Sequence, residues 1–261
     1  MSDVLLLPYH QDERLDERSI VLPAGVAPLV VDPELPIAGQ WHRLVILYDA
    51  FADRVAERVG AGPVRTVTGD CLAAVGTLAG LQRGGLDPSI VWFDAHGDVH
   101  TMESSESGYL GGLALRMVLG GDLTLLGEPL GLQALAEERA VLVDARDLDP
   151  AEERYLAGSR VTQTTVDEVS PEVLPAGPVL VHVDVDVIDA SELPGLRFPA
   201  AGGPTRERVL AAVERLLRSG RVAALDVACP WLGTDDASDV RRRAEVVAAF
   251  LALDGAATSD Y

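Results

Sequence analysis

The sequence contains neither lysine nor asparagine, and every one of the 21 residues counted as Lys or Arg is arginine. The absence of lysine excludes Schiff-base chemistry, pyridoxal phosphate enzymes and NTPases that need a P-loop lysine. The absence of asparagine removes every acceptor for N-glycosylation. The two cysteines, Cys71 and Cys229, are too few for a disulfide framework and favour a reducing, cytoplasmic location.

Positive charge is also scarce, because 41 acidic side chains stand against 21 basic ones and the net charge is −20. This charge repels phosphate backbones and anionic lipid headgroups, so we expect no nucleic-acid partner and no membrane partner. The first residues show no basic leader segment, and no apolar run approaches the roughly 20 residues that cross a bilayer. We therefore expect a small-molecule partner, while the oligomeric state stays open.

The 261 residues are long enough to bury a sizeable core, and 48% of them are hydrophobic. Short β-branched runs alternate with segments of helical period, which predicts an α/β fold with a mostly parallel sheet flanked by helices, formed as one domain over residues 1–261. A (β/α)₈ barrel is the alternative, and both folds place ligands at the C-terminal ends of the strands. Expected strands cover residues 4–7, 64–67, 90–93, 140–143, 179–183 and 222–227; the clearest expected helices cover 206–218, after an N-cap at Thr205, and about 240–253.

Two of the expected strands end in acidic residues at alternate positions. Asp94, His96 and Asp98 follow the strand 90–93, and Asp184 and Asp186 end the strand that begins at residue 179. On extended backbone, alternate side chains project to one side and converge. Taken singly, each set of acids could merely cap a turn or form a solvated loop.

Taken together, the two sets of acids would repel each other strongly unless cations lay between them. Oxygen ligands with one imidazole suit Mn²⁺ or Fe²⁺ better than structural Zn²⁺. Carboxylates that can bridge favour two ions that share a hydroxide. The sequence therefore predicts a two-metal centre.

With these motifs, the sequence resembles the arginase/agmatinase family of ureohydrolases. The resemblance runs in order through the segments 68–71 (Thr-Gly-Asp-Cys), 94–98 (Asp-Ala-His-Gly-Asp), 145–150 (Ala-Arg-Asp-Leu-Asp-Pro), 184–189 (Asp-Val-Asp-Val-Ile-Asp) and 229–233 (Cys-Pro-Trp-Leu-Gly). It implies the family's three-layer α/β fold with a parallel sheet of about eight strands. It also implies a dimanganese centre that hydrolyses a guanidine-type C–N bond.

The resemblance implies a role for each matching residue. Asp94 and Asp184 would bridge the two ions and the attacking hydroxide, Cys71 and Asp98 would complete one ion, and His96 and Asp186 the other. Asp149 would receive the substrate's α-amino group. The positions matched to its α-carboxylate are Ser105 and Ser107, for which a plain polar loop is the alternative, and His100 and Tyr109, where arginases commonly carry asparagine.

Three positions depart from the family pattern. Cys71 replaces a histidine ligand, with a small buried apolar residue as the alternative role. Gly111 stands where a histidine shuttles protons in relatives, and Val227 replaces a guanidinium-binding glutamate, with Asp226 one residue out of register. Strand alternation would point Asp226 to the other face unless a bulge intervenes.

With these departures, the sequence resembles the members of the family that hydrolyse Nω-hydroxy-L-arginine to hydroxyurea and L-ornithine in D-cycloserine biosynthesis. An N-hydroxyguanidine is less basic than a guanidine, and its own hydroxyl can carry a proton. A conventional arginase or agmatinase, and an inactive metal-binding relative, remain the alternatives. Arg146 and Asp147 are expected to form a structural ion pair rather than to contact substrate.

Overall fold

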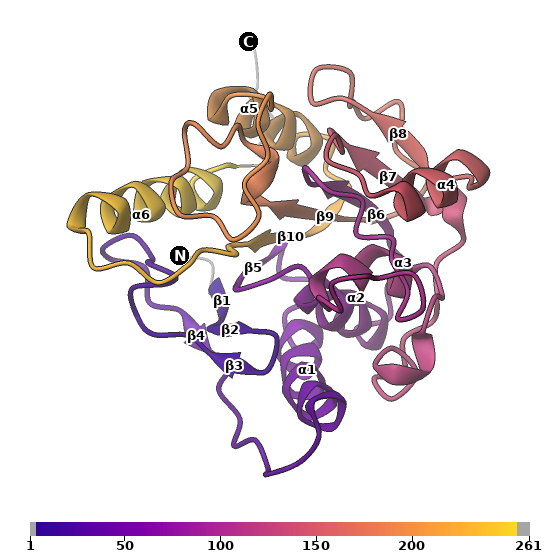
Figure 1. Ribbon diagram of the computed structural model, residues 1–261, viewed down its shortest axis with the longest axis horizontal. Helices are drawn as coiled ribbons and strands as arrows, with labels where there is room; N and C mark the ends of the chain where they lie inside the picture. Colours follow the sequence, from indigo (N-terminus) through magenta and orange to yellow (C-terminus); the bar gives the residue numbers. More distant parts are fainter. Residues whose placement is uncertain (1–3, 255–261) are drawn as a thin grey trace.

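The computed structural model describes residues 4–254, and its centre is an open sheet of eight strands in which every neighbouring pair is parallel (Figure 1). The sheet does not close, so the barrel alternative is wrong. A separate antiparallel pair consists of β2 (Tyr9–His10) and β3 (Glu13–Arg14). In spatial order the strands of the main sheet are β4 (Leu29–Val30), β1 (Val4–Leu7), β5 (Val64–Thr68), β10 (Val222–Ala228), β9 (Val179–Asp184), β6 (Ser89–Phe93), β7 (Ala140–Val143) and β8 (Thr162–Thr164).

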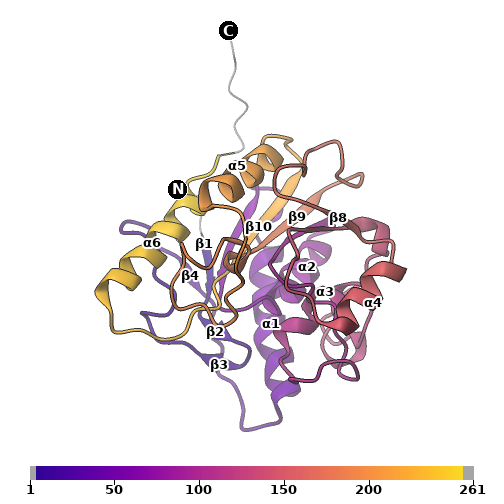
Figure 2. The ribbon, with the colours of Figure 1, turned by 45° about the horizontal axis from the view of Figure 1, so that its top comes forward.

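Helices cover both faces of this sheet and make the molecule three layers deep (Figures 1 and 2). On one face lie α1 (Gln40–Ala56), α2 (Ala73–Arg83) and α3 (Ala114–Val118), and α4 (Pro150–Gly158) adds Leu156 to the same core. On the other face lie α5 (Arg206–Leu217) and α6 (Ala237–Leu251). Four short 3₁₀ turns complete the described chain: η1 (Gly111–Leu113), η2 (Leu123–Leu125), η3 (Glu137–Arg139) and η4 (Val185–Val187).

The central strands are apolar along their whole length because both faces of the sheet are covered. Successive residues alternate between the two cores: Trp92 packs on the α1 and α2 side, and Phe93 packs on the α5 and α6 side. The predicted three-layer α/β fold with a parallel sheet is confirmed.

The expected strands agree with the observed ones to within one residue at each end. Thr205 caps α5 as predicted, since its side chain accepts a hydrogen bond from the Arg208 backbone N–H. The helix expected at about 240–253 begins earlier, because the Asp236 side chain caps it through Ser238, and it ends at Leu251. The edge strands β4 and β8, only two and three residues long, were not predicted.

The strand order brings the C-terminal ends of β5, β10, β9, β6 and β7 together along one edge of the sheet. The chain segments that leave β5, β6 and β9 there carry Cys71, Asp94 and Asp186, respectively. Within residues 4–254, no helix combines the length and the apolar character needed to cross a bilayer.

Candidate metal centre and substrate pocket

The first acidic set sits on a tight turn rather than on extended backbone. β6 ends at Phe93, and the Asp94 carboxylate accepts a hydrogen bond from the His96 backbone N–H at 2.7 Å. Asp98 then adopts a left-handed conformation with φ of 50°. The convergence predicted from strand alternation therefore occurs, but the predicted cause is wrong: local side-chain to backbone bonding bends the chain.

The second set repeats this turn. The Asp184 carboxylate accepts a hydrogen bond from the Asp186 backbone N–H at 2.8 Å and opens the 3₁₀ turn η4. Asp186 Oδ1 in turn accepts a hydrogen bond from the Ala95 N–H at 3.2 Å, which ties the two turns together across the sheet edge. The acids cap their turns and also face one another, so the two interpretations of the sequence are compatible.

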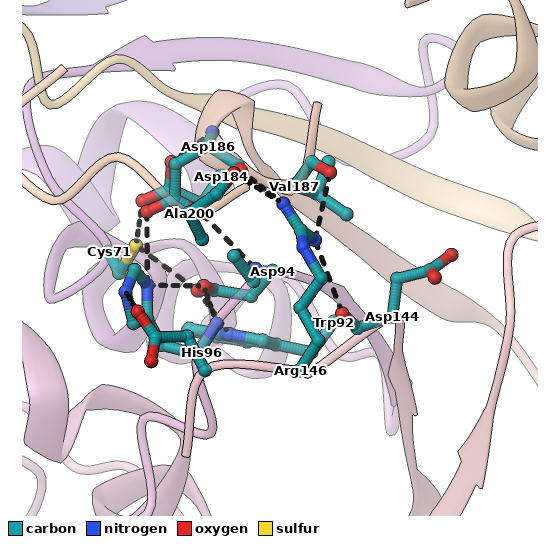
Figure 3. A network of polar contacts seen from close by, with 12 residues as sticks. Cys71, Trp92, Asp94, His96, Asp144, Arg146, Asp184, Asp186, Val187 and Ala200 are labelled. Atoms are coloured by element: carbon teal, nitrogen blue, oxygen red, sulfur yellow. Dashed lines mark hydrogen bonds and ion pairs between the residues drawn. The ribbon is translucent and has the colours of Figure 1, made fainter. Parts of the chain in front are cut away.

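Side chains from three strand ends meet at this edge (Figure 3). The Cys71 Sγ atom lies 2.8 Å from Asp184 Oδ2 and 3.8 Å from Asp94 Oδ2. The His96 Nδ1 atom lies 3.3 Å from Asp94 Oδ1 and 3.1 Å from Asp186 Oδ2. One thiol, one imidazole and three carboxylates thus share a small, largely buried volume.

The electrostatics of the cluster reflect crowded negative charge. Burial, followed by the charges of neighbouring carboxylates, raises the pKa of Asp98 and Asp184 well above the usual range and that of Asp186 to about 7. Burial alone would lower the pKa of His96, but hydrogen bonds to Asp186 and Asp94 raise it to about 12. Burial also opposes ionisation of Asp94, yet hydrogen bonding to His96 lowers its pKa overall. The imidazolium of His96 thus acts as a counter-ion.

The donor set fits divalent cations. Asp98 Oδ2 is buried and has no hydrogen-bond partner within the described part of the chain. A buried carboxylate oxygen without a partner is costly, and a metal ion would satisfy it. Two sets of potential ligands occur around this cluster, and within each set the ligand atoms lie within 4.8 Å of one another. One set is Cys71, Asp94 and His182, and the other is Asp94, His96 and Asp186. Asp94 belongs to both sets, as a bridging ligand would.

A pocket of about 270 Å³ opens above the cluster. All residues predicted for the site line it, namely Cys71, Asp94, His96, Asp98, His100, Ser105, Ser107, Tyr109, Asp149, Asp184 and Asp186. The tertiary structure brings them together from strand ends and loops that lie far apart in the sequence. Among residues that sequence reasoning missed, Glu152, Asp147, Phe198 and Pro230 also line the pocket.

His100 and Asp149 are in direct contact at the wall of the pocket. His100 Nε2 lies 3.1 Å from Asp149 Oδ2, and its Nδ1 lies 3.1 Å from Ser104 Oγ. Glu152 sits behind them, where it accepts hydrogen bonds from the backbone N–H groups of Asp149 and Val99. Its spacing of three residues from the helix N-cap is the signal that could have identified it.

The Tyr109 ring fills the space next to Gly111. A β-carbon on Gly111 would lie 2.4 Å from Cε1 of that ring and 2.7 Å from its hydroxyl oxygen. The ring also packs against Phe198, with 4.6 Å between the ring centroids. Burial raises the pKa of Tyr109 well above its usual value, so the phenol that lines the pocket stays protonated.

The contacts of Asp226 and Arg146 test two expectations drawn from the sequence. Asp226 does not line the pocket; its Oδ2 lies 2.7 Å from His182 Nδ1 on the α1 and α2 face of the sheet. The expected ion pair between Arg146 and Asp147 is wrong. The Arg146 guanidinium instead donates to backbone carbonyl groups, including that of Val187 at 3.1 Å (Figure 3), and Asp147 Oδ2 lies 3.8 Å from His96 Nε2.

Comparison with known proteins decides the family. The family model described as "Arginase family" matches residues 31–251. The chain belongs to the arginase family. Curated arginases from Eremothecium gossypii and Bacillus caldovelox are 32% and 33% identical to it over 198 and 181 residues. These alignments cover 70% and 64% of this chain but 49% and 60% of the relatives, so the match to this arginase-family chain spans about half to three fifths of their length.

Solved structures agree on the fold of this arginase-family chain. The native arginase of Bacillus caldovelox superposes with a TM-score of 0.78 at 23% identity, over 99% of this chain and 100% of that one. Proclavaminate amidino hydrolase from Streptomyces clavuligerus superposes with a TM-score of 0.66 at 19% identity, over 98% and 93% of the two chains. At these identities the likeness establishes the arginase-like architecture alone.

Proposed function

We propose that this arginase-family protein is a metal-dependent hydrolase that cleaves the guanidino C–N bond of Nω-hydroxy-L-arginine. One water is consumed, and the products are hydroxyurea and L-ornithine. The observation that carries the proposal is the packing of the Tyr109 ring against Gly111, the position where the family pattern has a proton-shuttling histidine. The space that a side chain at position 111 would need is filled by a phenol that stays protonated. A substrate with its own hydroxyl on the guanidino group needs that shuttle least.

The donor set supports a pair of manganese ions, the cofactor of the family. Cys71 and Asp98 would hold one ion, His96 and Asp186 would hold the other, and Asp94 and Asp184 would serve both, as the family resemblance implies. When bound, the ions supply a hydroxide nucleophile at neutral pH. The mutual repulsion of the buried carboxylates supports this assignment, because divalent charge between them relieves it.

The amino-acid end of the substrate would lie toward the mouth of the pocket. Asp149, whose side chain is 69% exposed, would accept a charge-assisted hydrogen bond from the α-ammonium group, with His100 holding the carboxylate in place. Ser105 and Ser107 already accept backbone hydrogen bonds from the N–H groups of Gly108 and Tyr109. The two hydroxyl oxygens also lie 3.5 Å apart, where one can donate to the other, so the second hydroxyl proton is left to bind an α-carboxylate.

Tyr109 would face the reacting end. Its hydroxyl lies beside Gly111 in the pocket wall, and its raised pKa makes it a hydrogen-bond donor rather than a base. It would donate to the substrate's N-hydroxyl oxygen or to the leaving nitrogen. This role replaces the contact to the α-carboxylate that the family pattern implied for position 109.

The test is a product assay on Mn²⁺-loaded protein with Nω-hydroxy-L-arginine, L-arginine and agmatine. We expect kcat/KM to be highest for the hydroxylated substrate, with hydroxyurea as the product. Equal values, or a preference for L-arginine, would contradict the substrate assignment and favour a conventional arginase, the activity named for the curated relatives. Absence of turnover on all three substrates would favour an inactive metal-binding relative.

A further inference from the structure

His182 is a fully buried histidine in the middle of β9, two residues before Asp184 and on the same face of the strand. Its Nδ1 atom lies 2.7 Å from Asp226 Oδ2 on the neighbouring strand β10. The Thr66 hydroxyl donates to the other oxygen of Asp226. With both oxygens engaged as acceptors, Asp226 holds the imidazole in the tautomer that carries its proton on Nδ1.

The same imidazole is fixed in its plane by stacking. The centroid of the Trp92 ring lies 3.7 Å from that of His182, with 27° between the planes. Trp92 also donates a hydrogen bond from Nε1 to Asp94 Oδ2 at 3.1 Å. The ring of His182 is thus oriented by the Asp226 carboxylate at one edge and by the stacked Trp92 ring, which itself hydrogen bonds to Asp94.

The remaining nitrogen, Nε2, is buried and has no hydrogen-bond partner anywhere in residues 4–254. A lone pair left unsatisfied in a buried site costs free energy unless a ligand takes it. A ring nitrogen of His182, Sγ of Cys71 and a carboxylate oxygen of Asp94 all lie within 4.8 Å of one another. The His182 ring, with its unsatisfied nitrogen, therefore borders the cluster proposed to hold metal.

We infer that His182 Nε2 is an additional ligand of the ion held by Cys71, with Asp226 as the residue that orients it. The inference rests on the proposed two-metal function. Metal-binding histidines characteristically donate their other ring N–H to a carboxylate, which is the arrangement of His182 and Asp226. His182 would return a neutral nitrogen to an ion whose other donors, Cys71 and the carboxylates, are anionic.

X-ray absorption at the manganese edge tests the inference on the wild-type protein loaded with two Mn²⁺ ions. Imidazole rings are counted from their outer-shell scattering. We expect two imidazoles for each pair of ions, from His96 and His182. A single imidazole in the wild type would overturn the inference, and this result does not depend on whether any variant folds.

Variants then assign the second imidazole. His182→Gln is expected to lose one imidazole from the spectrum, whereas His42→Gln, at an exposed position on α1, is expected to keep both. Asp226→Asn is expected to keep both imidazoles but to weaken binding of one ion by about 10–100-fold, as loss of an orienting partner does. Two imidazoles retained in His182→Gln would overturn the inference.

Turnover separates this inference from the proposed function. Wild-type protein that hydrolyses Nω-hydroxy-L-arginine but shows one imidazole would leave the function standing and remove His182 from the metal site. Wild-type protein that binds no Mn²⁺ would overturn both. An unchanged imidazole count with Mn²⁺ affinity lowered in His182→Gln would show that the residue only positions Cys71, and would likewise overturn its role as a ligand.

Discussion

The ring of Tyr109 lies across the space that a side chain on Gly111 would need, 2.4 Å from the position of its β-carbon. Gly111 is not in the left-handed region of backbone conformation, so the obstacle to a side chain there is the ring and not the main chain. Adjacent Gly112 differs, since a β-carbon on it would meet only His100 at 3.7 Å. These two glycines therefore offer a matched pair for substitution.

Gly111→Ala should displace the Tyr109 ring and lower stability, at a cost of about 1–3 kcal/mol typical of overpacking. Gly112→Ala should leave Tm nearly unchanged because its β-carbon meets ordinary van der Waals space. Thermal unfolding of both variants and the wild type checks this. Equal Tm values for the two variants would contradict the packing of Tyr109 on Gly111.

Gly111→His alone should not create arginase activity, because the new imidazole collides with the Tyr109 ring. The double variant Tyr109→Asn, Gly111→His removes the ring and supplies a proton shuttle. We expect it to gain kcat/KM for L-arginine relative to the single variant, since general acid catalysis contributes about 10²–10⁴-fold. Steady-state kinetics on L-arginine measure the difference, and equal rates in the two variants would argue against a shuttle at position 111.

Asp94→Ala and Asp184→Ala should each abolish activity and binding of both ions, because each carboxylate is proposed to bridge them. Metal content after dialysis, measured by elemental analysis, checks this. Asp235→Ala is the control, since that exposed carboxylate pairs with Arg18 at the surface. Two ions at full occupancy in either bridging variant would refute the assignment.

Asp149→Ala should raise KM for the hydroxylated substrate while the metal content stays the same. Loss of a charge-assisted hydrogen bond to the α-ammonium group costs about 1.5–3 kcal/mol, which corresponds to about 10–150-fold in binding. Glu153→Ala, an exposed acid in the same first turn of α4, is the matched control and should leave KM unchanged. An unchanged KM in Asp149→Ala would remove it from the substrate site.

Mn²⁺ affinity should rise with pH. In the metal-free cluster, the pKa values of His96 (about 12) and Asp186 (about 7) are raised, and burial raises that of Cys71. Each group must lose its proton to bind an ion, so protons compete with metal and affinity falls as pH falls. Calorimetric titration in buffers of different ionisation enthalpy should show release of about one proton or more, whereas affinity independent of pH would contradict this.

The sequence by itself determined the strands β1, β5, β6, β7, β9 and β10, the capped helix α5 and the family, because their signals are local: apolar runs, an N-cap threonine, and motifs in order along the chain. It also indicated which acids would gather at the sheet edge. The short edge strand β8 escaped prediction because three residues, two of them exposed, carry no clear alternation.

Only the tertiary structure decided which residues meet across elements. In the sequence, His182 is part of an apolar strand, and only the structure shows that β10 places Asp226 beside it. Arg146 was expected to pair with Asp147, but in the structure it donates to carbonyl groups of the turn η4. From the sequence, Gly111 is simply a position that lacks the histidine of relatives, whereas the structure shows that the Tyr109 ring fills the space a side chain there would need. Each relation depends on register between strands or on packing between loops, and long-range geometry of this kind leaves no periodic signal in one sequence.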